Sequence, residues 1–302
     1  MQQIAHYLNE MNENIVLSIS GGAGLFPASI GACYQINEYI KEIYPNRRIK
    51  YAGVSSGCIV AIMLSLEISQ QESFNFYQKF VGFFDKIYKN PLTYWYSACR
   101  KLLEAILSDP LAYKKLNNNL HVGITKIKLT GPEFVIISQF ESNQQVIDAI
   151  IVSGTLFPLS WTPLRIYNGY FACDGGYLSN YVTLKDHYNI VFKYDHVTGV
   201  FNPSDWLISI SVDKWHRLFQ GAQRHIRARE PQWKQIITSQ QNTKDIITSS
   251  DTSNTLTYAL RILKWLILKG RGIKIFMFLV TLYFISHRMK KLKYIEKNFY
   301  TS

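Results

Sequence analysis

A serine between small residues stands where a nucleophile could be presented to a substrate. Gly53-Val54-Ser55-Ser56-Gly57 has the pattern G-x-S-x-G, with Ser55 at its centre. The pattern follows the apolar run Ile49–Val54 and precedes residues 57–68, whose apolar spacing predicts a helix. A strand–turn–helix of this kind needs small neighbours and projects the serine hydroxyl at the helix N-terminus, where developing negative charge is favoured. We therefore predict that Ser55 is a nucleophile, with Ser56 as the competing hydroxyl.

A nucleophilic serine needs a base, and one aspartate is well placed in the sequence. Asp174 follows an apolar run and precedes Gly175 and Gly176, which predicts an accessible turn. A carboxylate beside Ser55 could take the serine proton directly, although an Asp-Gly pair is also common in turns without any function. The later histidines stand in no motif and are expected to be structural: His187, His196, His216, His225 and His287.

A glycine-rich turn near the N-terminus could bind negative charge. Gly21, Gly22 and Gly24 lie between a strand-like run, Ile15–Ser20, and a helical pattern, Pro27–Tyr44. Glycines there let backbone N–H groups approach a bound phosphate or a transient oxyanion closely. A dinucleotide-binding loop is not supported, because a proline stands where the third glycine is required and no ribose-binding acid is clear about twenty residues later.

The order of these three motifs resembles that of the patatin-like phospholipase family, whose lipid acyl hydrolases use a Ser–Asp dyad without histidine. The glycine loop comes first, G-x-S-x-G follows about thirty residues later, and D-G-G about 120 residues after that. The stretches "VIDAIIVSGTLFPL" and "DGGYLSNYV" are similar to the family's helix, proline turn and D-G-G-x-x-x-N segment. The likeness covers roughly residues 14–182, with a weaker similarity around Leu207–Val212.

The resemblance implies a role for each matching residue. Ser55 would be the nucleophile and Asp174 the base that activates it. Gly21, Gly22 and Ala23 would donate backbone N–H groups to the oxyanion. The dyad requires no metal and no cofactor. Three further glycines would permit close backbone approaches, two at the serine turn and one between the catalytic loops: Gly53, Gly57 and Gly175.

The chain departs from the family's glycine loop, which is usually G-G-G-x-R-G. The third glycine is replaced by Ala23, the arginine by Leu25 and the last glycine by Phe26. Asn180 matches the family asparagine after D-G-G, but the proline that often follows it is absent. These departures keep open a rival hypothesis, a catalytically weak, membrane-docked scaffold protein.

Strand-like and helical segments alternate in the first part of the chain, which predicts an α/β fold. The expected architecture is a three-layer α/β/α arrangement with a mostly parallel central sheet. A hairpin over Leu164–Cys173, turning at Asn168-Gly169, would deliver the chain to Asp174. The other predicted strands are Ile15–Ser20, Ile49–Val54, Leu120–Leu129, Glu133–Phe140 and Trp206–Val212, and the predicted helices are Pro27–Tyr44, Gly57–Ile68 and Gln144–Ser153.

Residues 71–118 are rich in aromatic side chains, and two interpretations remain open. In the first, these residues belong to helices that pack on the sheet. In the second, part of the aromatic surface forms a cap over an apolar site.

Positive charge is concentrated near the C-terminus. Residues 1–213 carry a net charge of −1, whereas residues 214–302 carry +13. The longest uninterrupted apolar run there is Ile275–Ile285, eleven residues, whereas a membrane span needs about twenty. We predict a segment that lies in the membrane interface, with a solvated helix pair packed on the core as the alternative. Nucleic acid is not an expected partner, because phosphate binding would not require the apolar run.

The expected organisation is a patatin-like catalytic domain at 1–241, a polar linker at 242–254 and a basic, apolar membrane-associating tail at 255–302. The N-terminus lacks the apolar core of a secretory signal. The four cysteines, Cys33, Cys58, Cys99 and Cys173, show no metal-ligand spacing and are expected to be mostly buried thiols in a reducing compartment. The expected location is intracellular, on the cytoplasmic face of a membrane.

Taken together, the residues and the resemblance predict a lipid acyl hydrolase of the phospholipase A or acylglycerol lipase type. Its substrate would be a phospholipid or an acylglycerol, cleaved through an acyl-enzyme on Ser55. An acyltransferase that passes the same acyl group to another alcohol is the alternative enzyme.

Overall fold

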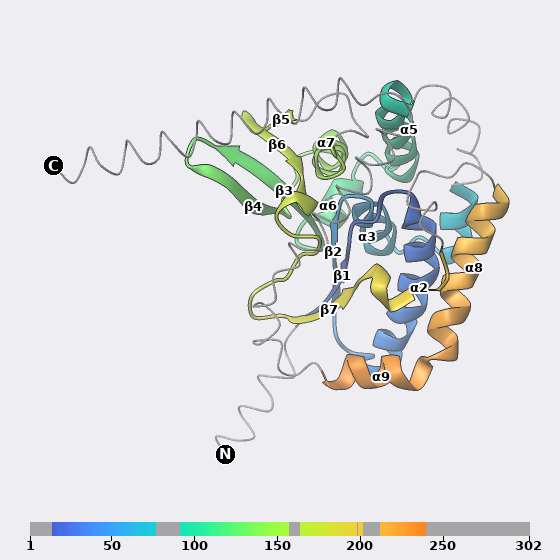
Figure 1. Cartoon of the computed structure of the whole chain (residues 1–302). Coiled ribbons are helices and arrows are strands. Elements are labelled where there is room, and N and C mark those ends of the chain that lie inside the picture. The colour runs from blue at the N-terminus through green and yellow to red at the C-terminus, as the bar shows by residue number, and fades with distance from the viewer. Residues whose placement is uncertain (1–13, 77–90, 157–163, 198, 202–211, 240–302) are drawn as a thin grey trace, which may run out of the picture. The chain divides into compact units, whose positions relative to one another are not determined.

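The computed structural model of the chain describes residues 14–76, 91–156, 164–197, 199–201 and 212–239. In this part of the chain the strands form one seven-stranded sheet of order β5-β6-β3-β2-β1-β7, with β4 paired to β3 (Figure 1). The strands are β1 (Ile15–Ile19), β2 (Ile49–Val54), β3 (Leu120–Lys128), β4 (Gly131–Ile137), β5 (Arg165–Tyr167), β6 (Tyr170–Asp174) and β7 (Tyr188–Phe192).

Helices flank the sheet, and the predicted α/β fold is confirmed. The α-helices are α2 (Phe26–Ile43), α3 (Gly57–Ser65), α5 (Pro91–Ile106), α6 (Ala112–Leu116), α7 (Asn143–Ser153), α8 (Val212–Ala228) and α9 (Glu230–Ser239). Three short 3-10 helices are η1 (Ala23–Leu25), η2 (Gly175–Tyr177) and η3 (Tyr194–Val197).

The sheet is mostly parallel. β1 pairs with β2 and β7 in parallel, and β2 pairs with β3 in parallel. All five residues of β1 are buried, as expected for a central strand covered on both faces. The predicted hairpin supplies the antiparallel part, because β5 pairs with β6 and β6 pairs with β3 in the antiparallel sense.

Two hydrophobic clusters fill the faces of the sheet. The larger contains Leu17 and Ile19 of β1 together with apolar side chains of α2, α3 and α7. The smaller lies on the other face, where Val16, Ala52 and Val54 pack with Val182. Alternate residues of β1 therefore contribute to different clusters, which is the period of two that a strand requires.

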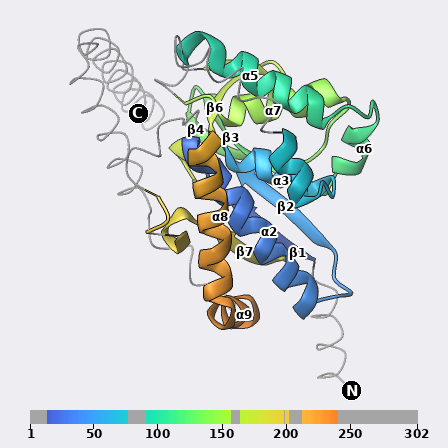
Figure 2. The ribbon, with the colours of Figure 1, turned by 90° about the vertical axis from the view of Figure 1, so that its right-hand side faces the viewer.

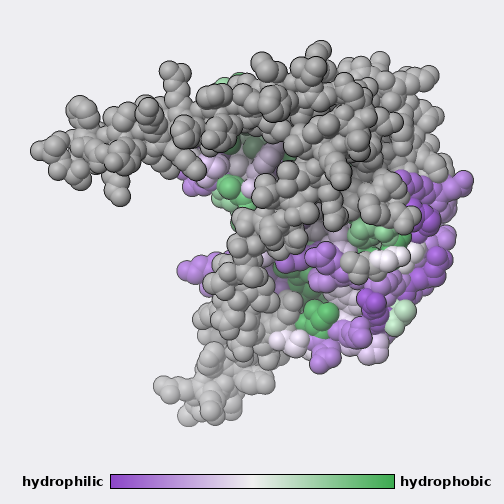
Figure 3. Space-filling model, viewed as in Figure 1, coloured by the Kyte–Doolittle hydropathy of each residue, from purple (hydrophilic) through white to green (hydrophobic). Residues whose placement is uncertain are grey.

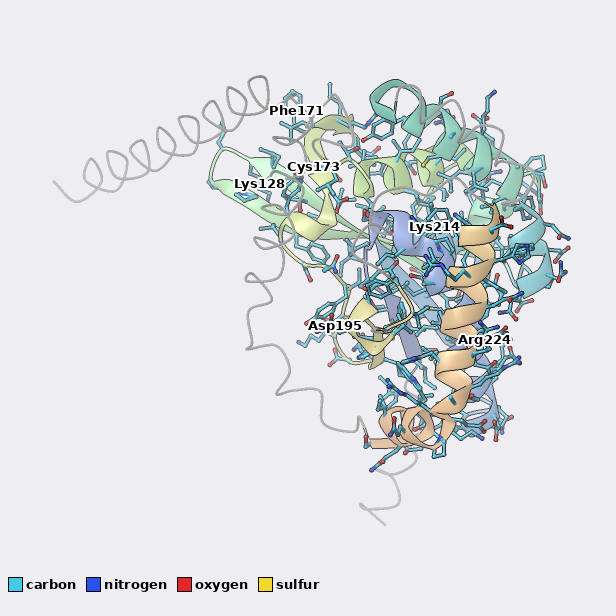
Figure 4. The ribbon with its side chains drawn as sticks, turned by 45° about the vertical axis from the view of Figure 1, so that its right-hand side comes forward. Lys128, Phe171, Cys173, Asp195, Lys214 and Arg224 are labelled. Carbon is cyan, nitrogen blue, oxygen red and sulfur yellow. The ribbon has the colours of Figure 1, made fainter. Side chains whose placement is uncertain are left out.

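α8 packs along α2, and the two helices lie side by side (Figure 2). A Cβ atom at Gly31 would lie 2.1 Å from the carbonyl oxygen of Phe219, so glycine permits this close approach. Trp215 of α8 is buried against α2, whereas Arg224 is exposed on the outer side of the helix. Figure 4 shows Lys214 and Arg224 on α8, and the surface in this region is mainly hydrophilic (Figure 3).

α3 ends earlier than its apolar pattern predicts, at Ser65 instead of residue 68. The Ile68 N–H donates to the Met63 carbonyl and the Glu67 N–H donates to the Leu64 carbonyl, both at 3.0 Å. These two bonds form a Schellman motif, in which the left-handed position is usually glycine. Glu67 occupies that position here with φ of 57°. No glycine stands just after Ser65 to mark the end of α3, so the predicted end at residue 68 was wrong.

Other predictions differ only at their edges or lie outside the described residues. β4 begins at Gly131 and ends at Ile137, before Phe140. Residues 206–211 of the predicted last strand are outside the described residues, and Val212 is the first residue of α8. The predicted linker and tail, residues 242–302, are outside them as well. Among the described helices, none is both long and apolar enough to cross a membrane.

Candidate active site

The sheet brings Ser55 and Asp174 to neighbouring positions beside β3. β2 runs parallel to β3 and reaches Gly123 with its last residue, Val54. β6 runs in the opposite direction and reaches Ile124 with its last residue, Asp174. Two strands that are separated by more than a hundred residues therefore end at consecutive residues of β3. Ser55 directly follows the end of β2, and Asp174 is itself the last residue of β6.

Ser55 lies on a sharp turn with a strained backbone. Its φ is 54°, in the left-handed region that a residue with a side chain rarely adopts. Strain of this kind costs about 1–3 kcal/mol and is characteristic of functional sites. A Cβ atom at Gly53 would lie 2.6 Å from the Cys58 nitrogen, and one at Gly57 would lie 2.3 Å from the Ile19 oxygen. Both glycines therefore permit the close approaches that the turn requires.

Asp174 is buried and only one of its carboxylate oxygens has a regular partner. Its side chain accepts the Gly176 N–H at 2.7 Å through Oδ1. Oδ2 is buried without a hydrogen bond of standard geometry among the described residues. The Ser55 hydroxyl is nevertheless close enough to lower the pKa of the carboxyl by hydrogen bonding. Catalytic hydrogen bonds are often long or poorly aligned in a free enzyme and tighten when substrate binds.

Burial sets the protonation behaviour of Asp174. Desolvation raises the pKa of this carboxyl from its ordinary value to about 7, and hydrogen bonds from Ser55 and Gly176 oppose the rise. A carboxylate with a pKa near neutrality is a stronger base than an exposed aspartate and is still ionised at neutral pH in a large fraction of molecules. Such a group is suited to general base catalysis.

The glycine loop lies against Ser55 and Asn180. A Cβ atom at Gly21 would lie 2.9 Å from Cβ of Ser55 and 3.0 Å from Oδ1 of Asn180. Asn180 also donates its side-chain amide to the Gly21 carbonyl at 3.2 Å. At Gly175, a Cβ atom would lie 2.5 Å from the Gly123 oxygen, so this glycine allows close packing of the aspartate turn on β3.

Two of the three N–H groups expected to face the oxyanion have partners within the protein. The Gly22 N–H donates to Oγ of Ser56 at 2.9 Å. The Gly21 N–H donates to the Asn180 carbonyl at 3.3 Å. The Ala23 N–H has no partner among the described residues and borders the cavity beside Ser55. The sequence could not reveal these internal bonds, and the oxyanion role of the loop stays a prediction.

A small apolar cavity opens beside Ser55. Its volume is about 30 Å³, well below the roughly 150 Å³ of an engineered apolar cavity that binds benzene. An acyl chain is much larger, so its binding requires the wall to move. Part of the wall comes from α5, as the cap interpretation expects, whereas Phe74 packs on His216 and Phe219 of α8, as the packing interpretation expects. The lining side chains are mainly apolar and include Ile59, Tyr96, Cys99, Leu103, Ile150, Ile151 and Leu156.

Histidines of the described chain make contacts away from this cavity. His187 lies 3.0 Å from the Lys50 ammonium, and His196 packs on the ring of Trp233. No described histidine lines the cavity beside Ser55. Within the described ranges there is also no group of three His, Cys, Asp or Glu side chains that could hold a metal ion. The acid–base group that the Ser55 hydroxyl reaches is the Asp174 carboxyl, whose pKa it lowers.

The sequence profile of patatin-like phospholipases matches residues 17–184, which is more than half of the chain. The chain belongs to the patatin-like phospholipase family. A search of curated proteins gave no match. Among solved structures, the chain is similar to VipD from Legionella pneumophila, with a TM-score of 0.35 and 11% identity over 60% of this chain and 49% of VipD. The chain thus spans about half the length of that protein.

The structure accounts for the three departures from the patatin-like glycine loop. Ala23 has φ of 47°, so an alanine holds a left-handed backbone where the family has glycine. Leu25 is fully buried and belongs to the hydrophobic core. Phe26 begins α2, and its ring meets that of Trp215 edge to face at 4.5 Å. Apolar packing against α8 therefore replaces the arginine and glycine of the patatin-like pattern.

Three functional contacts of this patatin-like site were missed by the sequence analysis. The Ser153 hydroxyl accepts the Ser55 N–H at 2.8 Å, and the Thr155 carbonyl accepts the Asp174 N–H at 3.1 Å. The ring of Tyr194 lies so close to Gly22 that a Cβ atom there would be 1.9 Å from it. These partners are distant in sequence from the motifs and carry no pattern of their own. Only the similarity of the segment around Ser153 to the family drew attention to it.

Proposed function

We propose that the chain is a lipid acyl hydrolase that cleaves carboxylic esters through an acyl-enzyme on Ser55, with Asp174 as the general base. The observation that carries the proposal is the buried Asp174 carboxyl beside the Ser55 hydroxyl on its left-handed turn. A strained serine at the start of a helix, next to a base with a pKa near 7, is arranged for nucleophilic attack.

The proposed reaction has two halves. The Asp174 carboxylate takes the hydroxyl proton as Oγ of Ser55 attacks the ester carbonyl carbon. The tetrahedral oxyanion collapses, the acyl–oxygen bond breaks, and protonated Asp174 returns the proton to the leaving alcohol. Water then attacks the acyl-enzyme, with Asp174 again accepting and returning a proton, and the fatty acid leaves. The Ala23 N–H would be one donor to the oxyanion, and the loss of such a donor typically reduces the rate by about 10²–10³.

The proposed substrate is a phospholipid or an acylglycerol, met at a membrane surface. The apolar cavity beside Ser55 supports an acyl chain as the group that is bound there. The basic and apolar sequence of residues 255–302 supports interfacial binding, with an intracellular location on the cytoplasmic face of a membrane. Residues 255–302 lie outside the described part of the chain, so this portion of the proposal rests on sequence.

A fluorophosphonate probe tests the nucleophile directly. The wild type should be labelled on Ser55, as mapped by mass spectrometry of the labelled peptide, and Ser55→Ala should not be labelled. Asp174→Asn should be labelled very slowly. Ser65→Ala is the matched control, since it removes a buried hydroxyl at the end of α3 that donates to the Ala61 carbonyl. Labelling of Ser56, or no labelling of the folded wild type, would contradict the proposal.

Lipid turnover then distinguishes the enzyme classes. The wild type should release fatty acid from vesicles of phosphatidylcholine or emulsions of diacylglycerol, and Ser55→Ala should not. Transfer of the acyl group to an added monoacylglycerol, in preference to water, would identify an acyltransferase on the same serine. A labelled serine without either product would favour the scaffold hypothesis.

A further inference from the structure

The Ser153 hydroxyl lies at the end of α7 and is saturated with hydrogen bonds. It donates to the Gly123 carbonyl at 2.6 Å and accepts the Ser55 N–H at 2.8 Å. The Cys58 thiol is a third partner, at 3.4 Å. A serine hydroxyl has one proton and two lone pairs, so these three contacts use its full capacity. Ser153 is completely buried, and water does not compete for these bonds.

The bond to Ser55 reaches the backbone of the strained residue itself. Ser55 follows the last residue of β2 and precedes α3, so neither element supplies an acceptor for its N–H. A buried N–H without an acceptor costs about 1–3 kcal/mol. The Ser153 hydroxyl therefore fixes the peptide plane that leads into the strained turn at Ser55.

The residues that follow Ser153 also bond to the backbone of Asp174. Two residues after Ser153, the Thr155 carbonyl accepts the Asp174 N–H at 3.1 Å. The Ser153 hydroxyl bonds to Gly123, the β3 residue next to the partner of Asp174. One short segment, Ser153–Thr155, thus bonds the backbone of both catalytic candidates and of the strand between them.

We propose that Ser153 is a positioning residue for the reaction, fixing Ser55 relative to Asp174 from the C-terminal end of α7. The inference rests on the proposed function, because it assumes that Ser55 is the nucleophile. Ser153 touches no reacting atom and acts through the Ser55 backbone. Its removal should slow the chemical step without weakening the binding of substrate or probe. A displacement of about 1 Å at a reacting group can reduce a rate by about 100-fold.

Ser65→Ala provides a matched control for Ser153→Ala. The Ser65 hydroxyl is also buried at the end of a helix, α3, and donates to the Ala61 carbonyl at 2.8 Å. That bond stays within α3 and does not involve Ser55 or Asp174. Each variant replaces a buried helix-end serine with alanine, so a loss of stability alone should affect both proteins similarly.

The experiment measures the rate of fluorophosphonate labelling against probe concentration and pH in the wild type and both variants. We expect Ser153→Ala to lower the maximal labelling rate about 10- to 100-fold, with unchanged half-saturation and unchanged apparent pKa, and Ser65→Ala to stay within about twofold. If Ser153→Ala does not fold, Ser153→Cys tests the same bond, because a thiol fills the space but is a weak acceptor.

Each other outcome overturns the inference. Equal labelling rates in the Ser153 and Ser65 variants would make Ser153 an ordinary buried hydroxyl. A change confined to half-saturation would show an effect on binding instead of positioning. If the wild type is not labelled at Ser55, the proposed function fails and the inference fails with it. If the wild type is labelled but the Ser153 variants react normally, only the inference fails.

Discussion

In the proposed reaction, Asp174 must lose its proton before it can accept one from Ser55, so the rate should depend on pH. Burial raises the pKa of the carboxyl to about 7. We therefore expect kcat/KM for a soluble ester to increase as the pH rises through about 7 and to level off above about 8. Steady-state rates between pH 5 and pH 9 would measure the profile. Activity that falls with pH over this range would contradict the role of Asp174 as base.

The raised pKa of Asp174 also has a consequence for stability. The folded protein holds the proton more tightly than the unfolded chain, so the contribution of Asp174 to stability is fully present below about pH 4 and is lost as the pH rises to about 7. Asparagine does not ionise in this range, so Asp174→Asn should not lose stability as the pH rises. We expect the variant to exceed the wild type in free energy of unfolding by roughly 2–4 kcal/mol at pH 8, measured by urea denaturation.

A matched measurement at pH 5 provides the control for Asp174→Asn, since most of the wild-type protein is then protonated at this site. The advantage of the variant should be much smaller there. A variant that is less stable at both values would show that the carboxylate bond to Gly176 outweighs the effect of burial.

At the scale of single residues, the sequence predicted side chains better than backbone partners. Ser55 and Asp174 could be proposed as nucleophile and base because nucleophilic chemistry requires particular residue types in particular turns. Ser153 could not be assigned its contact, because it lies 98 residues from Ser55 and a serine at the end of a helix is common. The sequence analysis explained Gly22 by the access that it gives to a backbone N–H. The structure adds a second reason, because the ring of Tyr194 leaves no space for a side chain at Gly22.

At the scale of elements, the start of α2 depends on a pair of aromatic rings. Phe26 and Trp215 are 2% and 1% exposed, and their edge-to-face contact joins α2 to α8. We expect Phe26→Ala to reduce the free energy of unfolding by about 3–5 kcal/mol, because it creates a cavity between the helices. Denaturant unfolding would measure the loss.

Phe171→Ala is a suitable comparison for Phe26→Ala. Figure 4 shows Phe171 on β6, the strand that carries Cys173 and ends at Asp174, and 56% of the residue is exposed. Its removal should change stability by less than about 1 kcal/mol. Similar losses in the two variants would mean that the contact between Phe26 and Trp215 contributes little to the joint between α2 and α8.

Elements were predictable where the apolar pattern and the turn residues agree. β2 has the predicted bounds, and the hairpin turns at Asn168, which has the left-handed φ of 45° that such a turn requires. The end of α3 was predicted too late because Glu67 takes the position at which glycine is usual. Backbone hydrogen bonds decide that boundary, and residue preference does not reveal it.

At the scale of the whole molecule, charge predicts how the protein should meet a membrane. Residues 255–302 contain ten Lys and Arg residues but one acidic residue. We expect the full chain to sediment with anionic vesicles at low salt and to be released at about 0.5 M salt, because headgroup attraction is screened beyond a few ångströms. Labelling of Ser55 by a soluble probe should be the same at both salt concentrations.

Neutral vesicles provide the control for this prediction. Binding to neutral and anionic vesicles that is equally strong and insensitive to salt would mean that apolar burial, not charge, holds the protein at the surface. Absence of binding to both would leave the basic segment without a membrane role. α8 carries exposed cations as well, including Arg224, so substitutions in residues 255–302 would be needed to assign the effect.

The arrangement of the strands was predictable in part. Alternating strands and helices predict the parallel pairing of β1, β2 and β3, because each connection must cross over the sheet. The place of β6 could not be predicted, since its partner on β3 is about fifty residues earlier and several strand edges were available. The closeness of Ser55 and Asp174 therefore followed from the resemblance and not from the pattern of the strands.

The register of β6 on β3 constrains which insertions the chain can tolerate. Successive residues of a strand point to opposite faces, so one residue added within Tyr170–Asp174 would turn the carboxyl away from Ser55. Residues added between β4 and α7 would lengthen a largely exposed connection and leave Ser55 and Asp174 in place. Related chains should therefore differ freely in the length of that connection while keeping the same count from the hairpin turn to the aspartate. The pairing of β2 and β6 with β3 therefore sets the distance between Ser55 and Asp174.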